Sequence, residues 1–151
     1  MNQQAPDPGP GRRLGVDVGA VRVGIALSDP APMLATPLVT LQRDADGGSD
    51  LQQLAGLVAE HEVVEVVVGL PKTLKGAHGT AAETARTYAE ALADRISPVP
   101  VRFHDERLTT VTASRMLSQR GVRGKRQRAV VDQAAAVEIL QAWLDARSQT
   151  T

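Results

Sequence analysis

The stretch Leu14–Asp29 constrains the fold more than any other part of this 151-residue chain. Apolar residues alternate at Leu14, Val16 and Val18, and this period of two is typical of a strand with one buried face. A second run, Arg22–Leu27, is rich in β-branched residues and follows a glycine that can form a tight turn. The stretch therefore predicts a β-hairpin.

Asp17 is the unusual residue of this hairpin. It lies within the first predicted strand, on the face opposite the alternating apolar residues, with Gly15 and Gly19 two positions to either side. Strands disfavour Asp, so a carboxylate with so little side-chain bulk around it indicates that a metal ion, a phosphate or both approach closely. The simpler alternative is an ordinary hairpin with a solvent-facing Asp.

Composition removes several classes of protein. The chain holds one Phe, one Trp and one Tyr, which argues against base recognition on an aromatic stacking platform. It has no Cys, so disulfides, cysteine-based zinc sites and cysteine nucleophiles are excluded. Its formal net charge is zero, so any affinity for nucleic acid must come from local charge. Because it lacks a membrane-length apolar run and a signal-peptide core, we expect a cytoplasmic protein.

The rest of the chain alternates between strand and helix patterns. We predict a disordered tail at 1–11, a single domain at 12–147 and a short tail at 148–151. In chain order, the predicted elements are the hairpin, a strand at 35–41, a helix from Asp50 to about 62 with Ser49 as its N-cap, a strand at 63–69, a helix at 80–95, a strand at 101–104, a helix from Thr109 or Thr110 to 119, a basic loop at 120–128 and a helix at 129–147. This order predicts an α/β fold: a five-stranded mixed sheet, in βββαβαβα order with one more helix at the end, flanked by helices.

Three acidic residues stand out in this layout. Asp17 lies in the first strand, Glu106 follows the last strand, and Asp132 lies in the first turn of the last predicted helix. The C-terminal ends of parallel strands gather at one sheet edge, where open α/β sheets bind ligands. Converging carboxylates repel one another unless a cation lies between them, and hard oxygen ligands suit Mg²⁺ or Mn²⁺. Two such ions about 3.5–4 Å apart can clamp the attacking water and the leaving oxygen of a phosphodiester.

Each of these residues also has a simpler interpretation. Asp17 can be a surface residue, and Glu106 can pair with Arg107. Asp132 can simply favour a helix N-terminus. The set gains meaning only if the fold brings its members together. The second-rank acidic candidates are Asp29, Asp105 and Glu138.

Basic residues gather between two of these carboxylates. The window from Arg107 to Val131 holds seven Lys and Arg residues and no acid. Such a strip would hold a phosphate backbone as point charges without reading sequence, and the alternative is a solvated helix end and loop. The loop Lys72–Gly79 precedes a helix and adds two lysines. The predicted nucleic-acid contacts are Arg22, Lys72, Lys75, Arg107, Arg120, Arg123, Lys125, Arg126 and Arg128.

Four segments together resemble the YqgF (RuvX) family over about residues 13–144. They are Leu14-Gly15-Val16-Asp17-Val18-Gly19 with Arg22-Val23-Gly24-Ile25-Ala26 and Ser28-Asp29, Val68-Gly69-Leu70-Pro71, Asp105-Glu106-Arg107-Leu108-Thr109-Thr110, and Asp132-Gln133-Ala134-Ala135-Ala136 with Ile139-Leu140. The resemblance implies an RNase H-like fold related to the RuvC resolvases, and a metal-dependent nuclease whose acidic set is Asp17, Glu106 and Asp132. It also implies a link to maturation of the 5′ end of pre-16S rRNA, and a Holliday-junction resolvase role has been proposed for the family.

The chain departs from the family pattern in one loop. Thr73 and Lys75 occupy the stretch after Gly-Leu-Pro where members often carry Asn and an acidic residue. The change makes the loop more basic and leaves the three carboxylates untouched.

Several functions stay open at this point. We expect an endonuclease that cuts structured RNA, in which water attacks phosphorus, Asp17 bridges two metal ions, and Glu106 and Asp132 complete their ligand shells. A pre-rRNA, alone or within a ribosomal particle, is the expected partner of a monomer or homodimer. One alternative is a Holliday-junction resolvase, which needs a symmetric dimer. A second is an ATP-using phosphotransferase, whose D-x-G turn is similar but which needs two domains. A third is a non-catalytic nucleic-acid-binding protein, which would not need Asp17.

Overall fold

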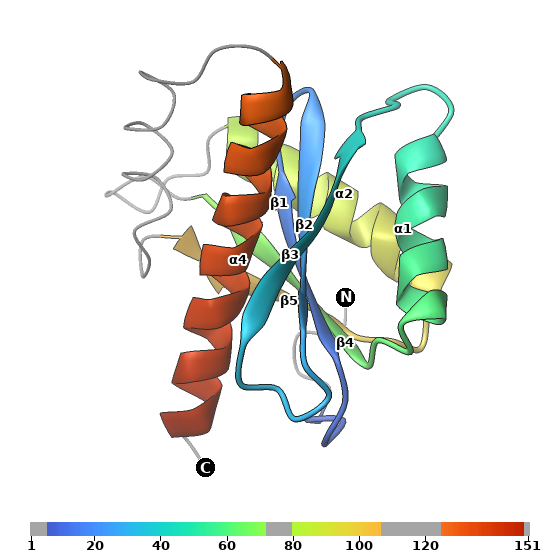
Figure 1. Ribbon diagram of the computed structural model, residues 1–151. Coiled ribbons are helices and arrows are strands. Elements are labelled where there is room, and N and C mark those ends of the chain that lie inside the picture. Colours follow the sequence, from blue (N-terminus) through green and yellow to red (C-terminus); the bar gives the residue numbers. More distant parts are fainter. Residues whose placement is uncertain (1–5, 72–79, 107–124, 150–151) are drawn as a thin grey trace.

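The structure, a computed structural model, describes residues 6–71, 80–106 and 125–149, with side chains in the last range described for 131–147. A sheet forms its middle layer, with two of the described helices on one face and one on the other (Figure 1). The predicted loop Lys72–Gly79 and the helix predicted after Thr109 lie outside the described residues, as does 120–124 of the predicted basic loop.

The sheet has five strands in the order β3-β2-β1-β4-β5. The strands are β1 (Arg13–Val18), β2 (Arg22–Ser28), β3 (Ala35–Gln42), β4 (Glu65–Leu70) and β5 (Val101–Asp105). β2 pairs antiparallel with both β1 and β3, whereas β1, β4 and β5 run parallel. The predicted mixed five-stranded sheet is confirmed, although β4 begins two residues later than expected. Because β1, β4 and β5 are parallel, their C-terminal ends meet at one edge.

Three described helices cover the sheet. α1 (Ser49–Glu60) and α2 (Thr80–Ile96) pack against each other on one face, and α4 (Lys125–Gln149) crosses the other face over β1, β2, β3 and β4 (Figure 1). None of these helices is long and apolar enough to cross a membrane.

Side chains of the central strands alternate between two cores. Leu14 and Val16 of β1 are fully buried beneath α1 and α2, together with Leu54. Val67 of β4 faces the other way, into a core that α4 supplies with residues such as Ile139. The alternation predicted for the first strand is therefore correct. It directs positions 15 and 17 of β1 toward α4.

Small residues let α4 lie close to the sheet. A Cβ placed on Gly15 would lie 2.7 Å from Cβ of Leu140 and 3.0 Å from the carbonyl oxygen of Ala136. Real Cβ atoms do not approach so closely, so any side chain at this position would push the helix outward. The glycine pattern of the first strand therefore fixes the depth at which α4 packs.

The start of α1 differs from the prediction. Ser49 is not the N-cap: the capping position is Gly48, in the left-handed region with φ 69°, and no side chain caps the helix. Asp44 organises the preceding loop instead, because its carboxylate accepts hydrogen bonds from the amides of Gly47 at 2.9 Å and Ser49 at 3.2 Å.

The last helix begins earlier than predicted. It starts at Lys125 rather than at Ala129, so Lys125, Arg126 and Arg128 belong to α4 and not to a basic loop. Lys, Arg and Gln are good helix formers, and this run continues the helix toward its N-terminus. Asp132 therefore lies roughly two turns into the helix and not in its first turn.

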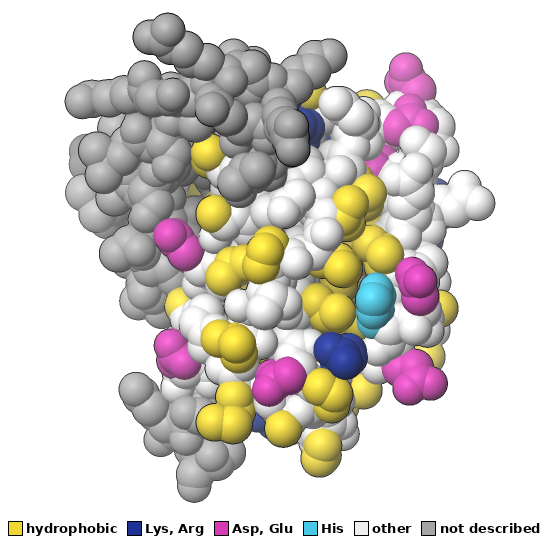
Figure 2. Space-filling model, in the orientation of Figure 1, with side chains coloured by type: hydrophobic (Ala, Val, Ile, Leu, Met, Phe, Trp, Pro, Cys, Tyr) yellow, Lys and Arg dark blue, Asp and Glu magenta, His cyan; other side chains and the backbone are white. Residues whose placement is uncertain are grey.

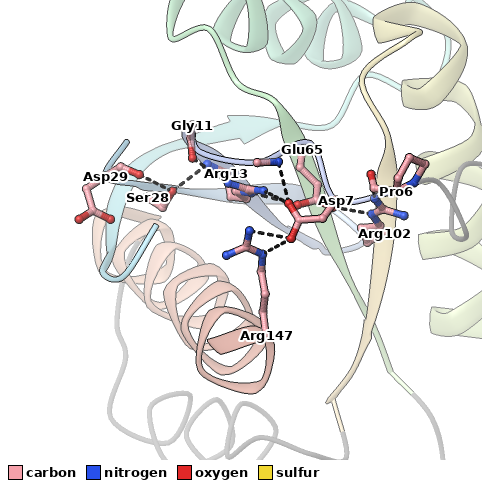
Figure 3. A network of polar contacts seen from close by, with 10 residues as sticks. Pro6, Asp7, Gly11, Arg13, Ser28, Asp29, Glu65, Arg102 and Arg147 are labelled. Atoms are coloured by element: carbon pink, nitrogen blue, oxygen red, sulfur yellow. Dashed lines mark hydrogen bonds and ion pairs between the residues drawn. The ribbon is translucent and has the colours of Figure 1, made fainter. Parts of the chain in front are cut away.

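A buried charged cluster closes the end of the sheet opposite the C-termini of the parallel strands (Figure 3). Glu65, the first residue of β4, is 2% exposed and accepts hydrogen bonds from Nε of Arg13 at 2.9 Å and from Nε of Arg102 at 2.5 Å. One carboxylate thus connects the beginnings of three parallel strands.

The N-terminal segment joins the same cluster. Asp7 pairs with Arg13 at 3.0 Å and with Arg147, near the end of α4, at 2.6 Å (Figure 3). The Pro6 carbonyl accepts a hydrogen bond from Arg102 at 3.1 Å. The disordered tail over 1–11 stays a prediction, and in the structure three charged side chains of the domain, Arg13, Arg102 and Arg147, contact residues 6–7 of that segment.

Candidate active site at the C-terminal edge of the central strands

A row of residues crosses the whole sheet on the face that α4 covers. Thr40, Gly24 and Asp17 are aligned across β3, β2 and β1. Gly69 of β4 lies one position beyond the Val16–Val68 pair, and is itself aligned with His104 of β5. The carboxylate at the centre of this row thus has a glycine on each neighbouring strand, and those two positions offer no side chain to screen it.

Asp17 is buried, with 4% of its surface exposed. It lies near the C-terminal end of β1, directly before the turn that the Gly19 amide closes by donating to the Arg22 carbonyl at 2.9 Å. Since Val16 packs into the α1–α2 core, the side chain of Asp17 is directed to the α4 face. The carboxylate predicted from the hairpin pattern is therefore buried rather than solvent-facing.

Glu106 lies over the glycine on one side of Asp17. It directly follows β5 and is 4% exposed. Its Oε2 atom lies 3.1 Å from the place a Cβ of Gly69 would occupy, and Cδ1 of Ile139 from α4 lies 2.5 Å from the same place. The parallel sheet and the missing side chain at position 69 together bring this carboxylate to the strand beside Asp17.

Asp132 lies over the glycine on the other side. A Cβ on Gly24 would overlap the carbonyl oxygen of Asp132 and lie 3.1 Å from its Cβ. The Asp132 carboxylate accepts a hydrogen bond from Nε of Arg22 at 2.8 Å through Oδ2. The side chains of this ion pair are about one-fifth exposed, at 20% for Arg22 and 19% for Asp132.

The fold therefore brings the three predicted carboxylates to one edge, two of them over strands that flank the third at the usual spacing of about 4.8 Å. Their chemistry suits a hard divalent cation such as Mg²⁺ or Mn²⁺, and the two glycines let Asp132 and Glu106 approach the strands on either side of Asp17. As the side chains stand, no group of three or more His, Asp or Glu residues in the described part of the chain is placed to hold a metal ion. The donor set fits such a cation, and in this structure the Asp132 carboxylate is paired with Arg22.

His104 belongs to this edge although the sequence does not single it out. It is 7% exposed and aligned with Gly69, and burial lowers the pKa of its imidazole, an effect that the Asp105 charge opposes. A lone His in a strand carries no spacing signal, so only the sheet register could place it here.

The second-rank acid Asp29 has a local role instead. Its Oδ1 atom accepts hydrogen bonds from the amides of Met33 at 2.8 Å and Leu34 at 3.1 Å, which shape the turn between β2 and β3. These hydrogen bonds hold the pKa of Asp29 below its usual value. Asp105 ends β5 beside Glu106, and Glu138 lies on α4.

Of the nine basic residues predicted to contact nucleic acid, Arg22 alone has a described side chain, and it pairs with Asp132. The backbone places Lys125, Arg126 and Arg128 at the start of α4, at the same end of the sheet as the β1–β2 turn (Figure 1). Lys72, Lys75, Arg107, Arg120 and Arg123 lie outside the described residues.

A separate hollow lies between α1 and β3, the edge strand of the sheet. It has a volume of about 460 Å³ and is lined by Leu38, Val39, Leu41, Gln53, Gly56, Leu57 and Glu60. Figure 2 shows hydrophobic side chains gathered over these two elements. None of the three carboxylates lines this hollow, so it is not part of the candidate active site.

Comparisons with known proteins agree with this architecture. A family model described as RuvX, Holliday junction resolvase, matches residues 11–146. A Mycobacterium tuberculosis protein named "Putative pre-16S rRNA nuclease" is 62% identical over 143 residues, which cover 95% of this chain and 84% of the relative. A Rhodococcus opacus protein of the same name is 54% identical over 147 residues, covering 95% of this chain and 83% of the relative.

Among solved structures, Thermus thermophilus RuvC in complex with Holliday junction substrate aligns with a TM-score of 0.57 at 16% identity, over 93% of this chain and 97% of RuvC. This likeness shows the fold, which is RNase H-like. Within that class, the chain belongs to the RuvX family.

Proposed function

We propose that this chain is a metal-dependent endonuclease that hydrolyses phosphodiester bonds in the 5′-end processing of pre-16S rRNA. The observation that carries the proposal is the position of Asp17, a buried carboxylate between two glycines with Glu106 over one and Asp132 over the other. The substrate comes from the name of the relatives at 62% identity. Work on a ribosomal precursor would place the protein in the cytoplasm.

Asp17, Glu106 and Asp132 would hold Mg²⁺ or Mn²⁺, and a pair of ions suits so many carboxylates at one edge. When bound, such ions activate the attacking water and stabilise the leaving oxygen of a phosphodiester. The chain itself would hold the metal-ligating side chains in place. Asp17 and Glu106 are each 4% exposed, so packing restricts their side chains.

The surroundings of Asp17 suit a substrate backbone. The glycines at positions 24 and 69 let Asp132 and Glu106 lie close to the strand of Asp17, so ions held by these carboxylates would face the same stretch of backbone. The basic start of α4 lies at the same end of the sheet and would hold neighbouring phosphates as point charges. Such contacts carry no sequence information, so we propose that the shape of the pre-rRNA, or of a ribosomal particle around it, selects the cleavage position.

Mn²⁺-dependent cleavage of a pre-rRNA fragment tests the proposal with wild-type protein, D17N and D94N. Asp94 is exposed on α2, on the other side of the sheet, so D94N matches the chemical change without touching the site. We expect D17N to lower the cleavage rate roughly a thousandfold, because several kcal/mol of charge stabilisation depend on the metal ligands. Binding of the fragment should change less than about twofold, because phosphate contacts come from Lys and Arg.

Three outcomes would count against the proposal. Undiminished cleavage by D17N would remove Asp17 from the reaction. Equal loss of cleavage and of binding would show that the substitution damages the protein as a whole. Binding without cleavage by the wild-type protein, on both naked and particle-bound rRNA, would favour a non-catalytic binding protein.

A second candidate function is resolution of four-way DNA junctions. The observation that favours it is the fold shared with RuvC. A resolvase must present two active sites as a symmetric dimer, so a four-way junction belongs beside the RNA in the same assay. Paired symmetric nicks in the junction by a dimeric protein would favour this function over rRNA processing.

A further inference from the structure

The Arg22–Asp132 ion pair joins two residues that are 110 positions apart in the chain. We propose that Arg22 is a positioning residue that holds the Asp132 carboxylate at the rim of the site and releases it when a divalent cation competes for that carboxylate. This inference rests on the proposed function, since it concerns the same carboxylates.

The first support is that both backbones are fixed, so that only side chains can move. Arg22 is held by its carbonyl, which accepts a hydrogen bond from the Gly19 amide at 2.9 Å. The Gly19 carbonyl in turn accepts a hydrogen bond from Nη1 of Arg43 at 2.9 Å. The main chain of Asp132 is seated against Gly24. A change at this site is therefore a rotation of the Asp132 side chain and not a movement of α4.

The second support is the geometry of the pair. Arg22 lies two positions before Gly24 on β2, so its side chain is on the same face as Asp17 and Gly24. Its Nε atom contacts only Oδ2 of Asp132, at 2.8 Å, and the Asp132 carboxylate has no other hydrogen bond within the described residues. The guanidinium of Arg22 is thus the cation that the Asp132 carboxylate binds. The pair lies beside β2, one strand away from Asp17.

The third support is the strength of the pair. Both side chains are about one-fifth exposed, so the pair lies at the rim of the site, where water screens it in part. A divalent cation shared with Asp17 and Glu106 offers twice the charge in a buried site. The ion pair is therefore strong enough to hold the Asp132 carboxylate in the metal-free protein. It is also weak enough for a divalent cation to replace the guanidinium as the partner of that carboxylate.

The test is the affinity for Mn²⁺ alone, measured by titration calorimetry without substrate. We expect R22Q to bind Mn²⁺ about three- to tenfold more tightly than wild type, because the competing guanidinium is gone. R12Q is the matched control: Arg12 donates to the Ser28 carbonyl at the far end of the sheet, and its loss removes the same charge. R12Q should leave the affinity within about twofold of wild type.

A double-mutant cycle shows whether Arg22 acts through Asp132. In the D132N background, Arg22→Gln should no longer change the Mn²⁺ affinity. If the full effect persists there, Arg22 acts through its charge alone and the positioning role is overturned. Equal or weaker Mn²⁺ binding by R22Q also overturns it. R22M keeps the apolar stem and replaces R22Q in the cycle if the glutamine variant does not fold.

Failure of this inference can be told from failure of the proposed function. D17N belongs in the same titration, and it should lose most Mn²⁺ binding if the carboxylates hold the metal. If D17N binds Mn²⁺ as wild type does, the proposed site itself is wrong. If D17N loses binding while R22Q equals wild type, the site stands and the role of Arg22 is wrong.

Discussion

Asp17 and Gly24 are aligned in the β1–β2 ladder, and the main chain of Asp132 passes through the space that the glycine leaves empty. A side chain at position 24 would meet the Asp132 carbonyl oxygen first and Cβ of Asp132 next, at 3.1 Å. The separation between the two aspartates is therefore set by a residue that has no side chain.

Gly24→Ala should displace α4. The new Cβ meets backbone atoms, which cannot rotate away, so we expect a loss of about 1–3 kcal/mol in the free energy of unfolding. Mn²⁺ affinity should fall with it, because Asp132 moves away from Asp17. Urea unfolding and Mn²⁺ titration measure both effects. The control is Gly56→Ala in α1, where a Cβ meets nothing within 4 Å and should raise stability by about 0.5–1 kcal/mol.

Gly69→Ala should separate activity from stability. Here the new Cβ meets side-chain atoms, Cδ1 of Ile139 and Oε2 of Glu106, which can shift. We expect a stability loss of only about 1 kcal/mol but a cleavage rate at least tenfold lower, because Glu106 is pushed out of place. Thermal unfolding and single-turnover cleavage test this difference. An alanine variant that cleaves at the wild-type rate would show that the position of Glu106 over Gly69 is not needed.

Glu65→Ala should be among the most destabilising single changes in the chain. Glu65 is 2% exposed and accepts hydrogen bonds from Arg13 and Arg102, so its removal leaves two buried guanidiniums without their shared carboxylate. The expected loss is about 3–5 kcal/mol in the free energy of unfolding. Glu90→Ala, at an exposed position of α2, should stay within about 0.5 kcal/mol of wild type. Similar midpoints for the two variants in chemical denaturation would refute the role given to Glu65.

Asp7 should make stability depend on pH in the acid range. Partial burial raises its pKa, but the Gly9 amide and the Arg147 and Arg13 charges lower it more, so the pKa lies below 3.8. The stabilisation is therefore complete above about pH 4 and is lost as the pH falls through the lower folded-state pKa. Because Asp7 is 46% exposed, water screens the ion pairs and we expect only about 0.5–1 kcal/mol.

Asp7→Asn should remove that part of the pH dependence. Unfolding midpoints of the variant and of wild type should differ at pH 7, and the difference should shrink as the pH falls below 3.8. A constant difference across this range would mean that Asp7 acts by packing and not by charge.

Replacement of Arg123, Lys125, Arg126 and Arg128 by Ala should weaken nucleic-acid binding and flatten its salt dependence. Each phosphate contact that is lost lowers the slope of log K against log salt by about 0.7 to 0.9. Fluorescence anisotropy with a short RNA, from low to moderate salt, gives this slope. An unchanged slope would remove the basic strip from the substrate path, whatever happens to the affinity.

The sequence was sufficient for the sheet and for the surroundings of Asp17. Strict alternation at Leu14 and Val16 predicted that Asp17 lies on the opposite face of the strand, and in the structure that is the face that α4 covers. The glycine at position 15 could be recognised in the sequence as a position without side-chain bulk. A strand rarely contains such a position unless another group packs closely against it. These are local signals, which a period of two reveals.

Contacts between residues far apart in the sequence could not be predicted from such local patterns. Nothing local predicts that Arg22 pairs with Asp132, because the pair depends on how deeply α4 packs. The run from Lys125 to Arg128 was assigned to a loop from its charge, although its helix propensity is high. Asp7 follows a stretch with a disordered composition, and its contact with Arg147 exists only after the two ends of the domain meet.

The Asp7–Arg147 contact also has a practical consequence. α4 is seated over Gly24 at Asp132 and tied to Asp7 at Arg147, two points about 22 Å apart along the helix. A helix fixed at two such points has a defined tilt, and a helix fixed at one can pivot. A shortened protein that begins at Arg12 would lose the distant anchor while keeping every carboxylate, so residues 6–11 should be retained when the chain is trimmed for crystals or assays.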